Sequence, residues 1–197
     1  MSSSDARTDP RVIRSKQALR QALLHLMAER PFAAVSITDI VKQARYNRGT
    51  FYANYPSKEA LLDDIIAELM RDLIQAFRAP YEHVTILDLN QLHANSVTLF
   101  EHIQTHAALY STLTRSDVLP VLKERMYASL KAIIHEEFVH EDADLDPELL
   151  VIYSIHALLG LIFYWIESGY AHPAAYMQDQ LLKMLQRRPS SVKLKTR

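Results

Sequence analysis

Apolar residues recur along most of the chain at the three- and four-residue spacing of one helix face. No segment keeps the alternation of apolar and polar residues that a half-buried strand requires. Prolines and glycines stand mainly where such helices would begin or end. The pattern predicts an all-α protein of about nine helices.

Capping residues define the expected boundaries of the first four helices. Four N-caps precede them in chain order: Asp9, which Pro10 follows, then Ser36 or Thr38, then Asn47, and then Ser57. The first helix is expected to end near Arg30, and the fourth to stop before Pro80, because the residue before a proline avoids the helical conformation.

Five further helices are expected after the fourth, over residues 87–105, 107–113, 117–139, 147–168 and 173–188. The fourth of these five has the clearest boundaries. Asp146 is its N-cap, Pro147 occupies its first turn, and Gly169 is the glycine that commonly closes a helix.

Composition and charge narrow the class of protein. The chain has 197 residues and no cysteine, which excludes a disulfide scaffold, a cysteine-ligated zinc site and thiol catalysis. Residues 1–60 hold ten Lys/Arg and five Asp/Glu, whereas the remainder holds twelve and eighteen. We expect a basic N-terminal module that faces a polyanion, although chance variation among solvated faces would give the same asymmetry.

Two segments bear on where the protein acts. Residues 1–11 have no apolar core and are interpreted as a flexible arm, not a secretory signal. Residues 149–166 carry no formal charge but contain Ser154, His156 and Gly160, so a buried helix is favoured over a transmembrane one. The sequence predicts a cytoplasmic protein without a membrane partner.

The stretch at residues 36–62 has the organisation of a helix-turn-helix. A short amphipathic helix is followed by a tight turn at 44–47 and by a second short helix that begins at Arg48. Phe51 and Tyr55 lie one turn apart and would anchor the second helix, which leaves its polar side chains for a DNA groove.

This stretch resembles the DNA-binding region of TetR-type (tetracycline-repressor-type) transcription regulators. The matching pieces are "ITDIVKQA", "NRGTFYANY" and "SKEALL". The resemblance implies a homodimer that binds a palindromic operator in double-stranded DNA, with half-sites about 34–36 Å apart. The expected parts are a three-helix helix-turn-helix DNA-binding domain at 1–56, a larger helical bundle for ligand binding and dimerisation at 57–188 with its linking helix at 57–79, and a basic flexible tail at 189–197.

By this resemblance, residues of the supporting helix, the turn and the recognition helix would contact DNA. They are Thr38, Arg45, Tyr46, Asn47, Arg48, Gly49, Thr50, Tyr52, Asn54 and Lys58. Tyr52 and Lys58 would meet phosphates, as would the hydroxyls of Thr38 and Thr50. Arg48 would approach base edges.

The chain departs from the family pattern in the turn. Arg45 stands where glycine is usual, Tyr46 replaces a small apolar residue, and Asn47 replaces the usual serine cap. Asparagine caps a helix as well as serine does, so the recognition helix should still begin there. Arg45 would be strained if the turn needs a positive φ, and it would add a cation beside the phosphates.

The C-terminal apolar run is expected to form a dimer interface, because a helix that is apolar all round cannot face water in a stable monomer. By the resemblance, this helix and the last one form a four-helix interface with a second subunit. The expected interface residues are Leu158, Leu159, Gly160, Phe163, Tyr164, Met177, Leu181, Met184 and Leu185. The alternative is a purely intramolecular core.

The central helices carry aromatic and imidazole side chains suited to a cavity for a small effector. The candidates are Phe100, His102, Tyr110, Tyr127, His135, Tyr153 and His156. His156 stands first because it is a polar group within an apolar run and needs a partner there. Ordinary packing would account for the same side chains, and the body could dock a protein partner instead.

Neither an enzyme nor a metal site is expected. The histidines of "HEEFVH" at 135–140 are five residues apart, whereas zinc-binding histidines on a helix are four apart. His102 and His106 have that spacing but lack an identifiable third ligand, and no cofactor is predicted. The sequence favours a TetR-type DNA-binding regulator, a repressor, over a helical adaptor of the same fold that acts mainly through protein contacts.

Overall fold

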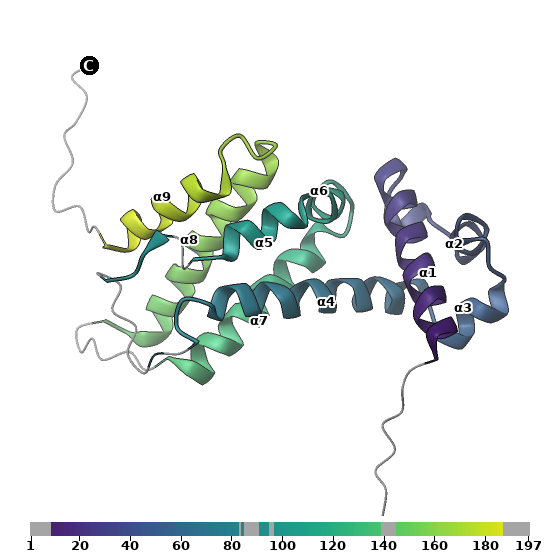
Figure 1. The fold of residues 1–197 in the computed structure, drawn as a ribbon, viewed down its shortest axis with the longest axis horizontal. Coiled ribbons are helices and arrows are strands. Elements are labelled where there is room, and N and C mark those ends of the chain that lie inside the picture. The colour runs from purple at the N-terminus through teal and green to yellow at the C-terminus, as the bar shows by residue number, and fades with distance from the viewer. Residues whose placement is uncertain (1–8, 83, 85–90, 95–96, 139–144, 187–197) are drawn as a thin grey trace, which may run out of the picture. The chain divides into compact units, whose positions relative to one another are not determined.

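The computed structural model describes residues 9–82, 84, 91–94, 97–138 and 145–186. All regular structure in these residues is helical, which confirms the all-α prediction and its nine α-helices (Figure 1). In chain order the elements are α1 (Pro10–Glu29), the 3-10 helix η1 (Phe32–Ala34), α2 (Ile37–Ala44), α3 (Arg48–Asn54), α4 (Lys58–Arg78), α5 (Leu99–Thr105), α6 (Ala107–Arg115), α7 (Leu119–Glu137), α8 (Pro147–Glu167) and α9 (Ala174–Gln186).

Side-chain caps begin the helices where the sequence predicts. Asp9 caps α1 and Ser57 caps α4, each by accepting a hydrogen bond from a backbone amide of the first turn. Ser36, not Thr38, caps α2. The Ser36 hydroxyl accepts from the Asp39 amide, and the Asp39 carboxylate accepts from the Ser36 amide, so the two residues form a capping box.

Helix α8 begins and ends as expected. Asp146 caps it by accepting from the Leu149 amide at 3.0 Å. Gly169 follows the helix with a φ of 70°, and Tyr170 is also left-handed with a φ of 60°. The Tyr170 amide donates to the Trp165 carbonyl at 3.0 Å, so two successive left-handed residues close α8 and turn the chain towards α9.

The helix expected over residues 87–105 is shorter in the structure. Helix α5 begins at Leu99. Residues 91–94 and 97–98 are not α-helical, so the prediction of a helix over those residues is wrong. The remaining positions before Leu99 lie outside the described residues. This run is rich in Asn, Ser and Thr, which compete for backbone hydrogen bonds, and the Thr98 hydroxyl donates to a carbonyl of α4.

The described residues form two compact units. The first contains α1, η1, α2, α3, α4 as far as Met70, and Ala108–Ala128. The second contains Arg71–Ala107 and the described part of Ser129–Arg197. Within the first unit α1 packs on α2 and α3, and within the second unit α5 packs on α9.

The core of the first unit is made by the apolar stripes of its helices. The side chains that are no more than 1% exposed include Leu19, Leu23, Ile40, Phe51, Leu61 and Ile66. Full burial of one such side chain contributes roughly 1.5–3 kcal/mol. Since these residues come from α1, α2, α3 and α4, they hold the short helices against the two long ones.

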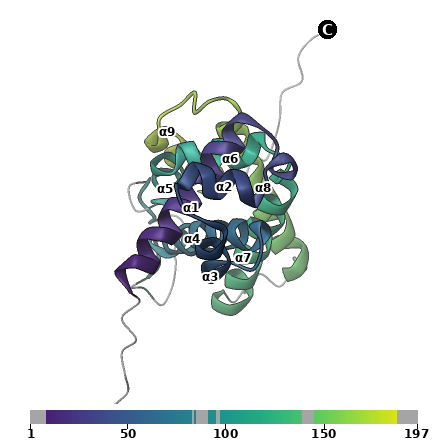
Figure 2. The same cartoon turned by 90° about the vertical axis from the view of Figure 1, so that its right-hand side faces the viewer.

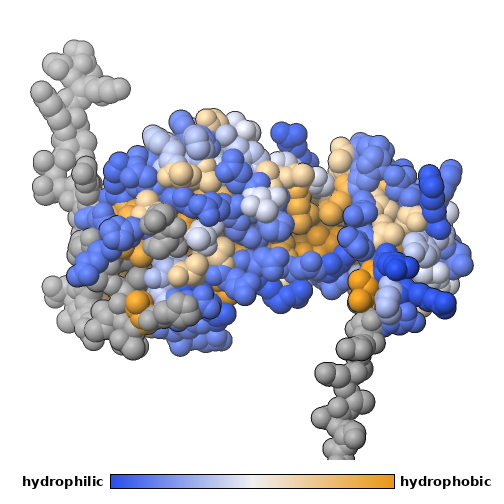
Figure 3. Space-filling view, viewed as in Figure 1, coloured by the Kyte–Doolittle hydropathy of each residue, from blue (hydrophilic) through white to orange (hydrophobic). Residues whose placement is uncertain are grey.

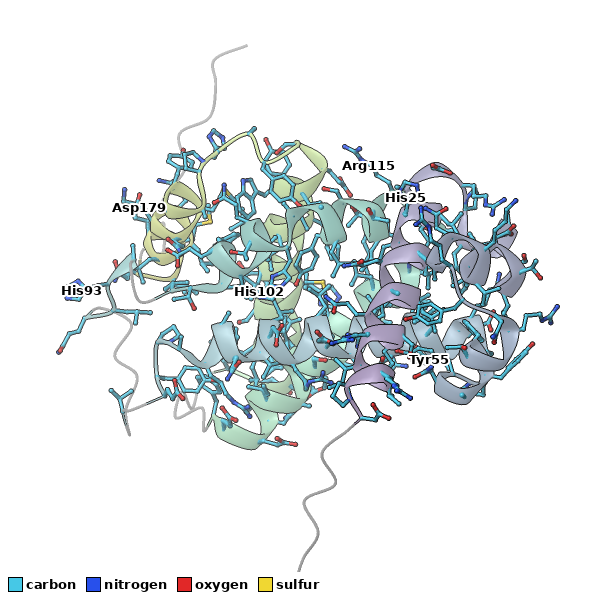
Figure 4. All side chains as sticks on the ribbon, turned by 45° about the vertical axis from the view of Figure 1, so that its right-hand side comes forward. His25, Tyr55, His93, His102, Arg115 and Asp179 are labelled. Carbon is cyan, nitrogen blue, oxygen red and sulfur yellow. The ribbon has the colours of Figure 1, made fainter. Side chains whose placement is uncertain are left out.

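An ionic network joins α1 to α4 beside this core. Arg20 of α1 forms salt bridges with Asp64, at 3.0 Å, and with Glu68 of α4. Tyr55, the residue after α3, donates its hydroxyl to Asp64 Oδ2 at 2.6 Å (Figure 4). Burial and then the Asp64 carboxylate raise the pKa of Tyr55, so its phenol remains a hydrogen-bond donor.

Trp165 is the centre of the second unit. It is fully buried, and its ring meets those of Phe100 and Tyr170 edge-on at centroid distances of 5.4 and 5.1 Å. The Trp165 indole donates to the His172 carbonyl at 2.8 Å. The Tyr170 hydroxyl donates to the Ala107 carbonyl at 3.0 Å. These contacts tie α8 to α5 and to the connection that leads into α9.

Helix α8 also carries apolar surface that its own unit leaves uncovered. By length and composition it could cross a membrane, a test that the core helix of a soluble protein also passes. Only 39% of its most apolar window is buried. Leu149, Tyr153 and Tyr164 are 64%, 73% and 64% exposed. Several large apolar side chains that lie together on a protein surface commonly mark a site of contact with another molecule.

Stability is expected to fall as the pH is lowered, in part because of His102. Burial and then the neighbouring His106 lower the pKa of His102 to about 4, from an ordinary value of about 6.5 (Figure 4). The unfolded chain therefore protonates at a higher pH than the folded chain, so the stabilising contribution is complete above about pH 6.5 and is lost as the pH falls towards 4. His102→Gln should flatten the dependence of the unfolding free energy on pH between about 7 and 5, measured by urea denaturation. Equal slopes in the two proteins would contradict this.

Candidate nucleic-acid interface

Helices α2 and α3 form the helix-turn-helix of the first unit. Residues 45–47 join them, and both helices pack on α1. Figure 2 views the molecule from the side of these helices. Phe51 is fully buried and Tyr55 is 4% exposed, which confirms both as the apolar anchors of α3. The other side of α3 is therefore the one that faces solvent.

The turn places Arg45 in the left-handed region, with φ 58° and ψ 39°. The Arg45 amide donates to the Lys42 carbonyl at 3.2 Å, and the Tyr46 amide donates to the Val41 carbonyl at 2.9 Å. This pair of bonds is a Schellman motif, which usually has glycine at the left-handed position. The left-handed conformation is less favourable by about 1–2 kcal/mol for a residue with a Cβ, so the strain expected for Arg45 is present.

Asn47 caps α3 in place of the usual serine. Its Oδ1 accepts from the Thr50 amide at 2.8 Å and from the Thr50 hydroxyl at 3.2 Å. A Cβ at Gly49 would lie 3.2 Å from the same oxygen, so glycine leaves room for the cap. The start of the recognition helix is therefore preserved, and the Thr50 hydroxyl has a partner within the protein.

Arg48 and Tyr52 form a pair on the exposed side of α3. Arg48 Nη2 donates to the Tyr52 hydroxyl at 3.2 Å, and the guanidinium lies 5.9 Å from the ring centroid. Tyr52 is 49% exposed and Tyr46 is 39% exposed, and Arg45 and Thr38 also face solvent. The surface over α2 and α3 in Figure 3 is mostly hydrophilic. Cations, hydroxyls and an amide thus lie together where phosphates and base edges could meet them.

Two of the predicted DNA-binding residues form hydrogen bonds with segments outside α2 and α3. Asn54 Nδ2 donates to the Ser15 hydroxyl of α1 at 3.2 Å and to the Thr50 carbonyl at 2.7 Å. Lys58 Nζ donates to three carbonyl oxygens at and after η1. Both side chains brace the helix-turn-helix, and the other eight predicted residues lie on α2, the turn and the exposed part of α3.

The seven residues predicted to line an effector cavity are distributed over both units. Tyr110 and Tyr127 belong to the first unit and the other five to the second. Phe100 and Tyr110 are buried, His102 and Tyr127 are half-buried, and His135, Tyr153 and His156 are exposed. A shallow depression of about 490 Å³ between α7 and α8 includes His135, which pairs with Glu148 at 3.2 Å.

The nine residues predicted at a dimer interface divide between two sides of α8 and α9. Gly160, Tyr164, Met184 and Leu185 are exposed, Leu158 and Leu181 are half-buried, and Leu159, Phe163 and Met177 are buried in their own unit. A Cβ at Gly160 would meet nothing within 4 Å. Gly160 and Tyr164 lie on the same side of α8 as Tyr153, whereas Met184 and Leu185 belong to α9.

Sequence reasoning missed the ionic groups that hold the helix-turn-helix in place. Arg20 and Asp64 pair across 44 residues, and Asp117 accepts a hydrogen bond from an amide 85 residues away. No local pattern marks such partners, because they depend on the packing of distant helices. The only available signal was the presence of charged residues beside the apolar stripes of α1 and α4.

Comparison with known families agrees with this geometry. Residues 19–65 match the family described as "Bacterial regulatory proteins, tetR family". Residues 90–187 match the family described as "Transcriptional regulator C-terminal region". The first match contains the helix-turn-helix, and the two matches together span most of the chain.

Individual relatives are also transcription regulators. The uncharacterised HTH-type transcriptional regulator YxbF of Bacillus subtilis (strain 168) is 28% identical over 189 residues, which are 90% of this chain and 46% of YxbF. The chain thus spans about half the length of that relative. The HTH-type transcriptional repressor DhaR of Mycobacterium sp. (strain GP1) is 23% identical over 158 residues, 75% of this chain and 80% of DhaR.

A solved structure shares the fold. The TetR transcriptional regulator from Streptococcus agalactiae 2603V superposes with a TM-score of 0.62 and 19% identity, over 91% of this chain and 97% of that one. The match over residues 19–65, which contains the helix-turn-helix, defines the class as transcription regulators with a DNA-binding domain. With both family matches, the chain belongs to the TetR family of transcription regulators.

Arg45→Gly is expected to stabilise the fold and to weaken DNA binding. Glycine relieves the left-handed strain, and a net gain of about 1 kcal/mol in unfolding free energy should remain after the larger entropy of the unfolded chain is subtracted. Loss of the guanidinium should also reduce the slope of log affinity against log salt for duplex DNA by about 1. Chemical denaturation and salt titrations measure the two effects.

Arg45→Asn is the matched control for charge, because asparagine tolerates the left-handed region better than most residues. It should reproduce the change in salt slope with a smaller gain in stability. If the unfolding free energy of Arg45→Gly is equal to or lower than that of the wild type, Arg45 is not strained by its left-handed conformation.

Proposed function

We propose that the protein is a transcriptional repressor that binds a palindromic operator as a homodimer. The observation that carries this proposal is the exposed Arg48–Tyr52 pair on α3, backed by buried Phe51 and set in a basic N-terminal part. The assignment as a repressor is supported by the relative DhaR, which is named a repressor.

The recognition helix is proposed to enter the major groove. A guanidinium can donate two hydrogen bonds to guanine in that groove. The hydrogen bond to the Tyr52 hydroxyl already orders the Arg48 side chain, so less conformational entropy is lost when Arg48 binds DNA. Arg45 and Thr38 flank α3 and would meet phosphates. Asn54 and Lys58 are assigned an indirect part, since their donors are used within the unit.

The uncovered side of α8, with the exposed end of α9, is proposed to bind a second copy of the chain. An exposed row of apolar residues gains about 25 cal/mol for each Å² that it removes from water. Gly160 on this side would allow two helices to approach closely. The helix-turn-helix of each subunit is its reading head. Two reading heads related by a two-fold axis would then meet half-sites about 34–36 Å apart.

The second unit is proposed to receive the signal, as a small-molecule effector or a docked protein. A ligand that favours a form unable to bind the operator would shift the population away from DNA. We further propose that the protein acts in the cytoplasm and has no catalytic role. The relatives and both family matches, which are transcription regulators, support this assignment.

Selection of bound DNA from a random duplex pool tests the proposed function. The full-length protein at near-physiological salt should enrich an inverted repeat with half-sites about one helical turn apart. If the folded, dimeric protein enriches no DNA, direct DNA recognition fails, and an adaptor that acts through protein contacts becomes the better explanation.

Arg48→Ala should weaken binding to the enriched site by about 5- to 150-fold and relax base preference at one position of each half-site, because a bidentate base contact contributes about 1–3 kcal/mol. Binding isotherms on the enriched site and on single-base variants measure both effects. Arg115→Ala removes an exposed cation from α6 and is the matched control, with affinity close to that of the wild type (Figure 4). Full affinity in Arg48→Ala would exclude Arg48 from base recognition.

Gly160→Arg tests the dimer surface without disturbing the single chain. A Cβ at this position would meet nothing within 4 Å, and arginine is a better helix former than glycine. We expect the variant to keep its helix content but to become monomeric in analytical ultracentrifugation at micromolar concentration. Ala132→Arg, at an exposed alanine of α7, is the control and should leave the dimer intact. A stable Gly160→Arg dimer would place the interface elsewhere.

A further inference from the structure

The 3-10 turn η1, between α1 and α2, takes its N-terminal cap from a distant part of the chain. Pro31 precedes the turn and offers no capping side chain. Instead, the Phe32 amide donates to Asp117 Oδ1 at 2.7 Å, and the Ala33 amide donates to Asp117 Oδ2 at 3.0 Å. One carboxylate thus satisfies two neighbouring backbone donors that would otherwise have only water.

Asp117 is held in position for this contact. It lies in the short connection between α6 and α7, and the Ser116 hydroxyl donates to its Oδ1 at 2.8 Å. Slight burial alone would raise the pKa of Asp117, but the bonds from Ala33, Ser116 and Phe32 lower it. The side chain is therefore an anion that accepts three hydrogen bonds. Figure 4 labels Arg115, which precedes this connection at the end of α6.

A cation holds the other end of the same turn. Lys58, the first residue of α4, donates from Nζ to the carbonyls of Phe32, Ala33 and Val35 at 2.9, 3.2 and 2.7 Å. Its ammonium also lies 4.5 Å from the centroid of the Phe32 ring. An anion at the amide end and a cation at the carbonyl end both match the dipole of a helical turn.

The clamped turn leads directly into the supporting helix of the helix-turn-helix. Ser36, which caps α2 with Asp39, is separated from η1 by a single residue. Arg30, just before η1, forms a salt bridge with the same Asp39 at 2.9 Å. A displacement of η1 would therefore move the start of α2 and, through α2, the presentation of α3.

We propose that Asp117 is a positioning residue for DNA recognition, which couples the α6–α7 connection to α2 through the clamp that it forms with Lys58 around η1. This inference rests on the proposed DNA-binding function. The clamp joins the two matched regions of the chain, because η1 lies within residues 19–65 and Asp117 within residues 90–187. A signal that moves the α6–α7 connection would thereby reach the reading head.

Loss of the Asp117 charge and loss of the clamp should change the affinity for DNA in opposite directions, so the direction of the measured change distinguishes them. Removal of a carboxylate from a unit that binds a polyanion should strengthen binding. Loss of the clamp should weaken it, because part of the binding free energy must then order η1 and α2.

The experiment compares full-length wild type, Asp117→Asn and Asp117→Glu on the site that the wild type enriches. Asp117→Asn should bind about 3- to 10-fold more weakly with an unchanged salt slope, since no phosphate contact is lost. Asp117→Glu keeps a carboxylate and should recover part of the affinity. Glu124→Gln, at an exposed carboxylate of α7, removes the same charge and should bind as tightly as the wild type or more tightly.

Amide hydrogen exchange provides the second readout, which a general loss of stability would not reproduce. In Asp117→Asn the amides of Phe32 and Ala33 and the first turn of α2 should exchange faster, while the core of α4 keeps its wild-type protection. Binding by Asp117→Asn that is equal to or tighter than wild type, or unchanged exchange in η1, overturns the inference alone. Absence of any enriched site with the wild type overturns the proposed function, and the inference with it.

Discussion

Helix α3 has seven residues, too few for an isolated helix to persist in water. Its conformation depends on contacts at both ends and on one side: the Asn47 cap, the burial of Phe51, and the bond from Asn54 to α1. A cap contributes about 1 kcal/mol and a buried phenylalanine roughly 1.5–3 kcal/mol. The surface that α3 exposes therefore exists only as long as the core behind it is intact.

The residues around that core contribute in two ways, through apolar packing and through charged groups. Aliphatic side chains supply most of the burial, whereas charged groups determine where the helices end and how they approach one another. Arg20 and Asp64 connect α1 with α4, and Asp117 and Lys58 close on η1 from opposite ends. These ionic groups bond to one another or to backbone groups of the same unit. They can therefore set the geometry of the reading surface without contacting a ligand themselves.

Much of this architecture could be predicted because its causes are local. Ser36 and Asn47 cap their own helices through amides three residues away, and the anchors of α3 follow from helical spacing. The strain at Arg45 was foreseeable for the same reason, since the residue departs from the glycine that a left-handed turn favours. The fold class and the turn between α2 and α3 therefore needed no knowledge of tertiary contacts.

Other features could not be predicted because their partners are backbone groups of distant segments. Lys58 was expected at a phosphate, yet its donors are taken by carbonyls whose position depends on how α1 ends. The start of α5 was misplaced because Thr98 bonds to α4 and not to its own helix. The dispersal of the candidate effector residues over two units likewise reflects packing, since aromatic and imidazole groups at helical spacing are also ordinary core residues.

The uncovered side of α8 has a consequence for the DNA-binding end of the molecule. Where a second chain covers that side, each reading head is tethered to another, and the second head meets its half-site at an effective concentration set by the tether and not by the solution. Dimerisation and operator binding then assist each other, because a ligand that binds only the dimer draws monomers into it by mass action. Occupancy of the operator would rise more steeply than the first power of protein concentration. A row of exposed apolar residues remote in sequence from the reading helix would thus give the regulator a threshold.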